Sequence, residues 1–173
     1  HVLDAAAALR DVHDIQFVFV GEGAEKAQLV QQADEQRLSN VTFLDPVDKP
    51  AVREFYALAD VCLTPLRDIP IFKTFIPSKI FEIMAMGRPI IAPLRGETAE
   101  ILEQSAAALV IEPENPTILA ESIRSLHDDR GRTATMGAKG RQFVVDHYSR
   151  DALATQYEQV MNEARDAYGV DAG

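Results

Sequence analysis

Short apolar runs alternate with helix-like segments along this chain of 173 residues, and this alternation limits the fold more than any other feature. The runs are rich in β-branched and aromatic residues, as buried parallel strands are, and they are residues 15–20, 40–44, 61–64, 90–92 and 107–111. Several segments between them, such as residues 49–59, carry apolar residues three and four positions apart, which is typical of amphipathic helices. Strands that alternate with helices form a parallel sheet with right-handed crossovers. We therefore expect an α/β fold with a parallel sheet flanked by helices.

Both ends of the chain also have helical patterns. Residues 2–9 are rich in Ala and Leu with no strand before them, so we expect a piece of a longer protein in which residues 1–173 form one domain. Three more helices are predicted at residues 116–127, 132–147 and 149 to about 168. The last has an apolar stripe that could pack in the core, contact a partner or lie on a membrane: Leu153, Tyr157, Val160, Met161 and Ala164. We expect this stripe to pack in the core, because the opposite face of the helix is acidic and anionic lipid would repel it.

Composition excludes some classes of protein. An apolar fraction of 47% and a charged fraction of 25% describe a globular chain. The formal net charge of -10 argues against nucleic acid as a partner, because phosphate backbones select positive surfaces. One segment differs, since residues 67–95 contain five basic residues against two acidic ones. A small anionic ligand is therefore plausible there, with chance clustering in a loop as the alternative.

Cysteine and histidine give little sign of chemistry. Cys62 is the single cysteine, so no intrachain disulfide can form, and its place in an apolar run favours a buried thiol over a nucleophile. The four histidines are not spaced as metal ligands, so we expect no metal site. No run of about 18 apolar residues and no signal-peptide pattern occurs, which predicts a cytoplasmic protein.

The segment from Pro77 to Pro89 is the strongest candidate for a binding site. Pro77 before an apolar periodic run predicts a helix start, and Gly87 followed by Pro89 predicts its end. Free backbone N–H groups and the helix dipole at such a start favour an anion, and Lys79 adds a positive charge. Glu82 lies about one turn further on, on the same face. A phosphate at the helix start and a hydroxyl-bearing group at the carboxylate describe a nucleotide, whereas the alternative is an ordinary solvated helix end.

Four loops follow the carboxyl ends of the predicted parallel strands and therefore lie at one rim of the sheet. Ligands of parallel sheets bind at this rim. The loops are residues 21–23, 45–47, 93–97 and a long connection, residues 65–76, that leads to the Pro77 helix. The pair Gly21 and Gly23 lacks the third glycine of the dinucleotide fingerprint, so NAD and FAD are discounted. Glu97 and Glu100 could form an acid–base pair, but near a helix start they more simply complement its dipole.

Several motifs together resemble a known family over nearly the whole chain. They are Val20-Gly21-Glu22-Gly23, Asn40-Val41-Thr42-Phe43, Ala59-Asp60-Val61-Cys62-Leu63-Thr64-Pro65 and above all Pro77-Ser78-Lys79-Ile80-Phe81-Glu82 continuing to Ile91. In this order they resemble the nucleotide-sugar-binding half of family 4 GT-B glycosyltransferases. The resemblance implies that this chain is the Rossmann-like C-terminal lobe of a GT-B fold and that the N-terminal lobe of that fold is missing here. It also implies a nucleotide sugar as the donor.

The resemblance assigns roles at the predicted helix start. Glu82 matches the second Glu of the family's Glu-x7-Glu motif, which holds the ribose hydroxyls of the donor. Thr74 stands at the place of the first Glu, which usually meets the transferred sugar. Ser78 and Lys79 are expected to meet the diphosphate. The predicted catalytic positions are therefore Lys79, at the diphosphate, and Thr74, at the transferred sugar. The Pro-Ser-Lys variant resembles transferases of N-acetylated or deoxy amino sugars in bacterial surface polysaccharides.

The resemblance also assigns roles in the other rim loops. Gly21 and Gly23 would let the donor approach the backbone closely, and the backbone of Val47 would face the base. Asp45 replaces the family's usual Gly in that loop.

The family's mechanism implies transfer with retained configuration, without a metal or other cofactor. The donor is expected to be a UDP-N-acetylated sugar and the acceptor a polysaccharide or lipid-linked chain, with peripheral contact at the inner face of the cell membrane through the missing lobe. The chain alone should be inactive. Two alternatives stay open: a non-catalytic nucleotide-sugar-binding module, suggested by Thr74, and a sugar-nucleotide epimerase of the same architecture.

Overall fold

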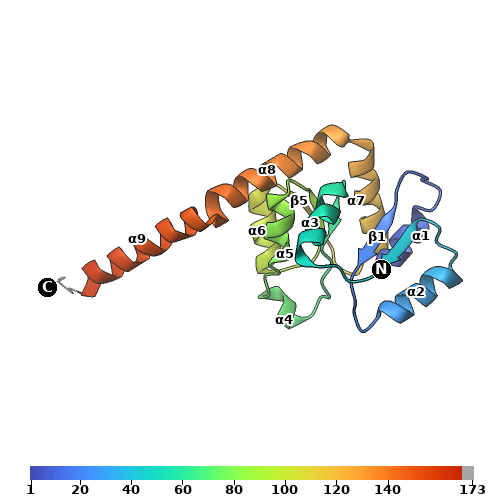
Figure 1. Cartoon of the computed structure of the whole chain (residues 1–173), viewed down its shortest axis with the longest axis horizontal. Coiled ribbons are helices and arrows are strands. Elements are labelled where there is room, and N and C mark those ends of the chain that lie inside the picture. The colour runs from blue at the N-terminus through green and yellow to red at the C-terminus, as the bar shows by residue number, and fades with distance from the viewer. Residues whose placement is uncertain (169–173) are drawn as a thin grey trace.

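The computed structural model describes residues 1–168 and has five parallel strands (Figure 1). Strands β1 (Phe17–Val20) and β2 (Val41–Leu44) form one sheet. Strands β3 (Cys62–Leu63), β4 (Ile90–Pro93) and β5 (Ala108–Ile111) form a second, in the order β3-β4-β5. Every strand lies where the sequence predicts one, which confirms the parallel α/β fold. The sheet itself is divided, because β1 and β3 are not paired with each other.

Helices fill the connections between the strands. Their bounds are α1 Val2–Ala8, α2 Lys26–Glu35, α3 Lys49–Leu58, α4 Pro70–Lys73, α5 Lys79–Ala85, α6 Glu97–Ser105, α7 Pro116–Asp128, α8 Arg130–Tyr148 and α9 Arg150–Tyr168. The short helix α4 corrects the sequence prediction, which has residues 65–76 as a loop throughout. Pro70 occupies the first turn of α4, where its fixed φ favours helix and its missing N–H leaves no bond unmade.

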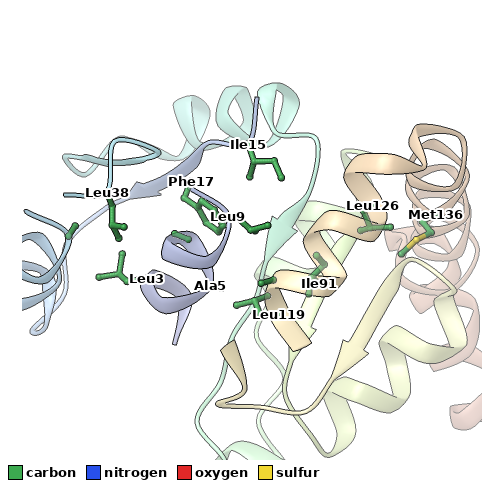
Figure 2. Packing of buried hydrophobic residues seen from close by; sticks show 13 residues of the cluster. Leu3, Ala5, Leu9, Ile15, Phe17, Leu38, Ile91, Leu119, Leu126 and Met136 are labelled. Carbon is green, nitrogen blue, oxygen red and sulfur yellow. The ribbon is translucent and has the colours of Figure 1, made fainter. Parts of the chain in front are cut away.

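Two apolar clusters lie on opposite faces of the β3-β4-β5 sheet, and the first also includes β1. Figure 2 shows the first, in which Leu9, just after α1, and Leu119 of α7 gather with Phe17 of β1 and Ile91 of β4. The second cluster joins β4 to α5, α6 and α8 through Ile80, Ile83, Met84, Ile90, Ala92, Leu102 and Val144. Adjacent residues of β4 therefore enter different clusters, and all four of its residues are buried. Helices α5, α6 and α8 are fixed by this second cluster.

Helix α5 ends where the sequence predicts and rests against α8. The N–H of Gly87 donates to Met84 O over 2.9 Å and that of Arg88 to Ile83 O over 3.2 Å, the pattern that closes many helices. Gly137 of α8 lies against this turn, since a Cβ added at Gly137 would stand 2.1 Å from Gly87 O. The two backbones thus touch without side chains between them.

Helix α9 extends away from the rest of the chain (Figure 1). Its predicted stripe is exposed, with Leu153 at 47%, Tyr157 at 68%, Val160 at 60% and Met161 at 53%. The prediction of core is therefore wrong, because α9 contacts the preceding helix α8 and none of its described side chains is buried. Within residues 1–168, no helix is both long and apolar enough to cross a membrane. Residues 169–173 of the predicted domain lie outside the described residues.

Candidate functional site

Side-chain contacts join the loops at the carboxyl ends of the strands. Lys26 of α2 pairs with Asp45 after β2, with 3.2 Å between Nζ and Oδ1. Arg67, in the connection after β3, pairs with Glu25 before α2 over 2.5 Å. These contacts link the start of α2 to the loops that follow β2 and β3. The predicted shared rim is thus present as a continuous set of contacts.

The β4–α6 turn holds the other side of the long connection. Arg95 pairs with Asp68 over 3.5 Å and also with Glu112 after β5. The Thr98 hydroxyl donates to Phe75 O over 2.8 Å. The connection that leads to α5 is therefore attached at both its beginning and its end.

A cavity of about 470 Å³ opens at the end of β1. Its lining includes Gly21, Gly23, Lys26 and Arg67. A Cβ added at either glycine would meet no atom within 4 Å, so the backbone there is open to the cavity. Gly21 also has φ +126°, a conformation that favours glycine on its own account. Val47 stands outside this cavity and is 37% exposed.

Helix α5 begins at Lys79, two residues later than the predicted start at Pro77. The first turn is tight, since Ile80 N–H donates to Pro77 O over 3.2 Å and Phe81 N–H to Ser78 O over 3.1 Å. Ser78 precedes the helix, and its side chain makes no capping bond. Because Ile80 and Phe81 are bonded, the N–H groups without a partner among residues 1–168 at this start are those of Ser78 and Lys79.

The two charged groups of α5 lie close to α3 and β3. Lys79 is exposed as a residue, yet protein atoms around its ammonium lower its pKa by desolvation. Glu82 is exposed. Burial first, and then the charge of Glu82, raises the pKa of Tyr56 on α3. Burial raises the pKa of Cys62 to about 11 despite the nearby Lys79, which agrees with a packed thiol rather than a nucleophile.

The structure brings only some of the predicted residues together. Ser78 immediately precedes α5, Lys79 and Glu82 lie in its first turn, and Thr74 is exposed at the end of α4. None of these four lines the cavity beside Gly21, so no single described cavity contains both halves of the predicted site. Among residues 1–168, no group of three metal-ligating side chains is present.

Sequence reasoning missed three contributors to this rim. Arg67 was visible as one of the basic residues of the segment 67–95, but its place in the cavity wall was not. Lys26 gave no signal beyond its place near Gly23. Thr98 gave none, because its partner Phe75 is 23 residues away in the chain.

Comparison with known proteins identifies the family. A family model described as glycosyl transferases group 1 matches residues 1–129. The chain belongs to this family. A curated relative from Mycobacterium tuberculosis, named GDP-mannose-dependent alpha-(1-6)-phosphatidylinositol monomannoside mannosyltransferase, is 29% identical over 150 residues. The match covers 85% of this chain and 39% of the relative.

Solved structures of glycosyltransferases share the fold. Sucrose-phosphate synthase from Thermosynechococcus elongatus superposes with a TM-score of 0.77 at 25% identity, over 96% of this chain and 43% of that one. Anabaena Alr3699/HepE in complex with UDP-glucose gives 0.77 at 20% identity, over 94% of this chain and 44% of that one. The fold is that of the C-terminal lobe of GT-B glycosyltransferases, which confirms the expected architecture. The chain spans well under half the length of these relatives.

Proposed function

We propose that this chain is the donor-binding lobe of a retaining glycosyltransferase that transfers a sugar from a nucleotide diphosphate to a polysaccharide or lipid-linked acceptor. Membership of the glycosyl transferases group 1 family supports a transferase. Alr3699/HepE, a neighbour in fold, was solved with UDP-glucose, which supports a nucleotide sugar as the ligand. The second lobe and the acceptor site would come from the remainder of the protein, so the chain alone should be inactive.

The arrangement at the start of α5 carries the proposal. The N–H groups of Ser78 and Lys79, which have no partner among residues 1–168, would bind the diphosphate together with the Lys79 ammonium, and Glu82 follows one turn later on α5. During glycosyl transfer, negative charge grows on the diphosphate as the bond between the sugar and the diphosphate breaks. Fixed donors aimed at that charge stabilise the transition state more than the ground state. Glu82 would accept hydrogen bonds from the ribose hydroxyls, which aligns the donor.

The finer assignments are parts of the same proposal. The Pro77-Ser78-Lys79 variant favours a UDP-N-acetylated sugar. Thr74 would contact the transferred sugar in place of a glutamate, and Val47 would face the base, with no metal or other cofactor needed. A cytoplasmic location, peripheral at the inner face of the membrane, would place the enzyme beside a lipid-linked acceptor. The relative that uses GDP-mannose makes a guanosine donor the competing choice.

Calorimetry on the full-length protein tests the donor. We expect UDP and UDP-N-acetylglucosamine to bind, GDP-mannose to bind more weakly, and Glu82→Gln to weaken UDP binding by about 10- to 100-fold, as loss of a charged hydrogen-bond acceptor does. Glu158→Gln, on exposed α9, is the matched control and should leave binding unchanged. Absence of binding to every nucleotide at millimolar concentration would overturn the proposal.

A non-catalytic nucleotide-sugar-binding module is the second candidate, and Thr74 at the place of a catalytic-site glutamate is the observation that favours it. Such a protein would bind the donor as described but release no UDP over hours with any acceptor extract. The epimerase alternative needs acids and a histidine at the rim, and none of the four histidines lies in the rim loops.

A further inference from the structure

The backbone before α5 rests directly on the β4–α6 turn. Gly96 opens α6 with φ +88° and ψ -156°, a region that side chains disfavour. A Cβ added at Gly96 would lie 2.1 Å from Lys73 O and 2.5 Å from Lys73 Cα. Real Cβ atoms do not approach backbone so closely. Any side chain at position 96 would therefore push the end of α4 away from α6.

A buried hydrogen bond holds the same segment two residues later. Thr98 is fully buried, and its hydroxyl donates to Phe75 O over 2.8 Å. Lys73 and Phe75 are the two neighbours of Thr74, so these contacts fix the backbone on both sides of that residue. The pair of Arg95 with Asp68 adds an exposed contact at the start of the connection.

The segment has few other means of keeping its position. Ile71 is 69% exposed, Phe75 49% and Ile76 38%, so these large side chains are only partly buried. Segments with few buried contacts open locally at low free energy. The next residue, Pro77, is buried and leads at once into Ser78 and Lys79. A shift at residues 73–75 would therefore displace both Thr74 and the start of α5.

We propose that Gly96 and Thr98 are positioning residues of the donor site, which act through the backbone of residues 73–75 to place Thr74 and the start of α5. Neither side chain needs to touch the donor. The inference rests on the proposed function, because it is the donor site that is positioned.

The test compares two threonines in the full-length protein. Thr98→Val removes the hydroxyl that holds Phe75 O. Thr133→Val is the matched control, because Thr133 is also buried and its hydroxyl donates over 2.8 Å to Leu126 O, between α8 and α7. Both should lower the melting temperature similarly, whereas only Thr98→Val should raise the Kd for UDP, by about tenfold, the factor that corresponds to one lost hydrogen bond. Thr98→Ser keeps the hydroxyl and should restore binding.

Equal Kd values for UDP in wild type, Thr98→Val and Thr133→Val would overturn the inference while leaving the proposed function intact. If the wild type itself binds no nucleotide, the proposed function fails, and hydrogen exchange separately tests whether Thr98 holds residues 73–75 and the start of α5 in place. The amides of Ile80 and Phe81, which donate to Pro77 O and Ser78 O, should then exchange faster in Thr98→Val than in Thr133→Val, and equal rates would refute it. If Thr98→Val does not fold, Thr98→Ala takes its place in both measurements.

Discussion

The contact between α8 and the end of α5 makes Gly137→Ala a sharp test of the packing. In an ordinary helix interior this change stabilises a protein by about 0.5–1 kcal/mol, because alanine loses less conformational freedom than glycine. Here the new methyl group would stand 2.1 Å from Gly87 O and 2.9 Å from Gly87 C. Helix propensity therefore predicts that Gly137→Ala raises the free energy of unfolding, whereas packing predicts that it lowers it.

Packing should win, because the atoms in the way are backbone. Restoring an ordinary contact of 3.4 Å to Gly87 O requires one backbone to move by about 1.3 Å. Overpacking of this kind costs roughly 1–3 kcal/mol, and the rigid turn at Gly87 favours the upper end. After the helix gain is subtracted, we expect a net loss of about 2 kcal/mol, or a fall in Tm of about 4–8 °C for a chain of this size.

Thermal and urea denaturation followed by circular dichroism would measure this loss. Gly131→Ala, in the same helix, is the control, because its added Cβ would meet only the Asp129 carboxylate at an ordinary 3.5 Å. That variant should be as stable as the wild type or more so. If Gly137→Ala melts as high as Gly131→Ala, the close approach of α8 to α5 is wrong, and so is the support we assign to the helix that carries Lys79.

Three further predictions concern buried or paired groups. Hydrogen bonds to Asp14 and Asp128 raise the pKa of His127 above 6.5, so the stability they give is present below that pH and is lost as the pH rises through the raised pKa. His127→Gln should therefore lower the Tm at about pH 5.5 and have little effect at about pH 9; an equal effect at both would contradict this. Cys62, with its pKa raised by burial to about 11, should react with a thiol reagent at about pH 8 only as fast as the chain unfolds. Thr64 is fully buried and its hydroxyl has no partner among the described residues, so Thr64→Val should raise the Tm by about 2–4 °C, and a fall would reveal an unseen partner.

The sequence predicted the fold well because each strand is a local apolar pattern. The run at residues 90–92 needs no knowledge of its neighbours to be read as a buried strand, and β4 is buried on both faces. Helix α4 is not predicted because four residues are too few to show a helical period. The prediction that the stripe on α9 is core is wrong because a pattern shows that a face is apolar but not what covers it.

In the candidate site too, features that depend on local spacing are predictable from the sequence and features that depend on distant contacts are not. The relation of Lys79 to Glu82 follows from helix spacing, so the sequence predicted that they share a face. The roles of Thr98 and Gly96 depend on contacts with Phe75 and Lys73, more than 20 positions away, and no local pattern encodes them. Nor could spacing show that the cavity beside Gly21 excludes the residues of α5.

The outstretched helix α9 has a consequence for how the chain melts. Its side-chain hydrogen bonds are local, such as Gln159 to Glu163 and Thr155 to the Asp151 carbonyl. A helix of 19 residues held in this way is only marginally stable in water. Its far end should fray gradually on warming, well before the domain unfolds cooperatively. The helical signal of the chain will therefore decline with a slope, and a chain that ends after α8 should show a flat baseline and the same midpoint.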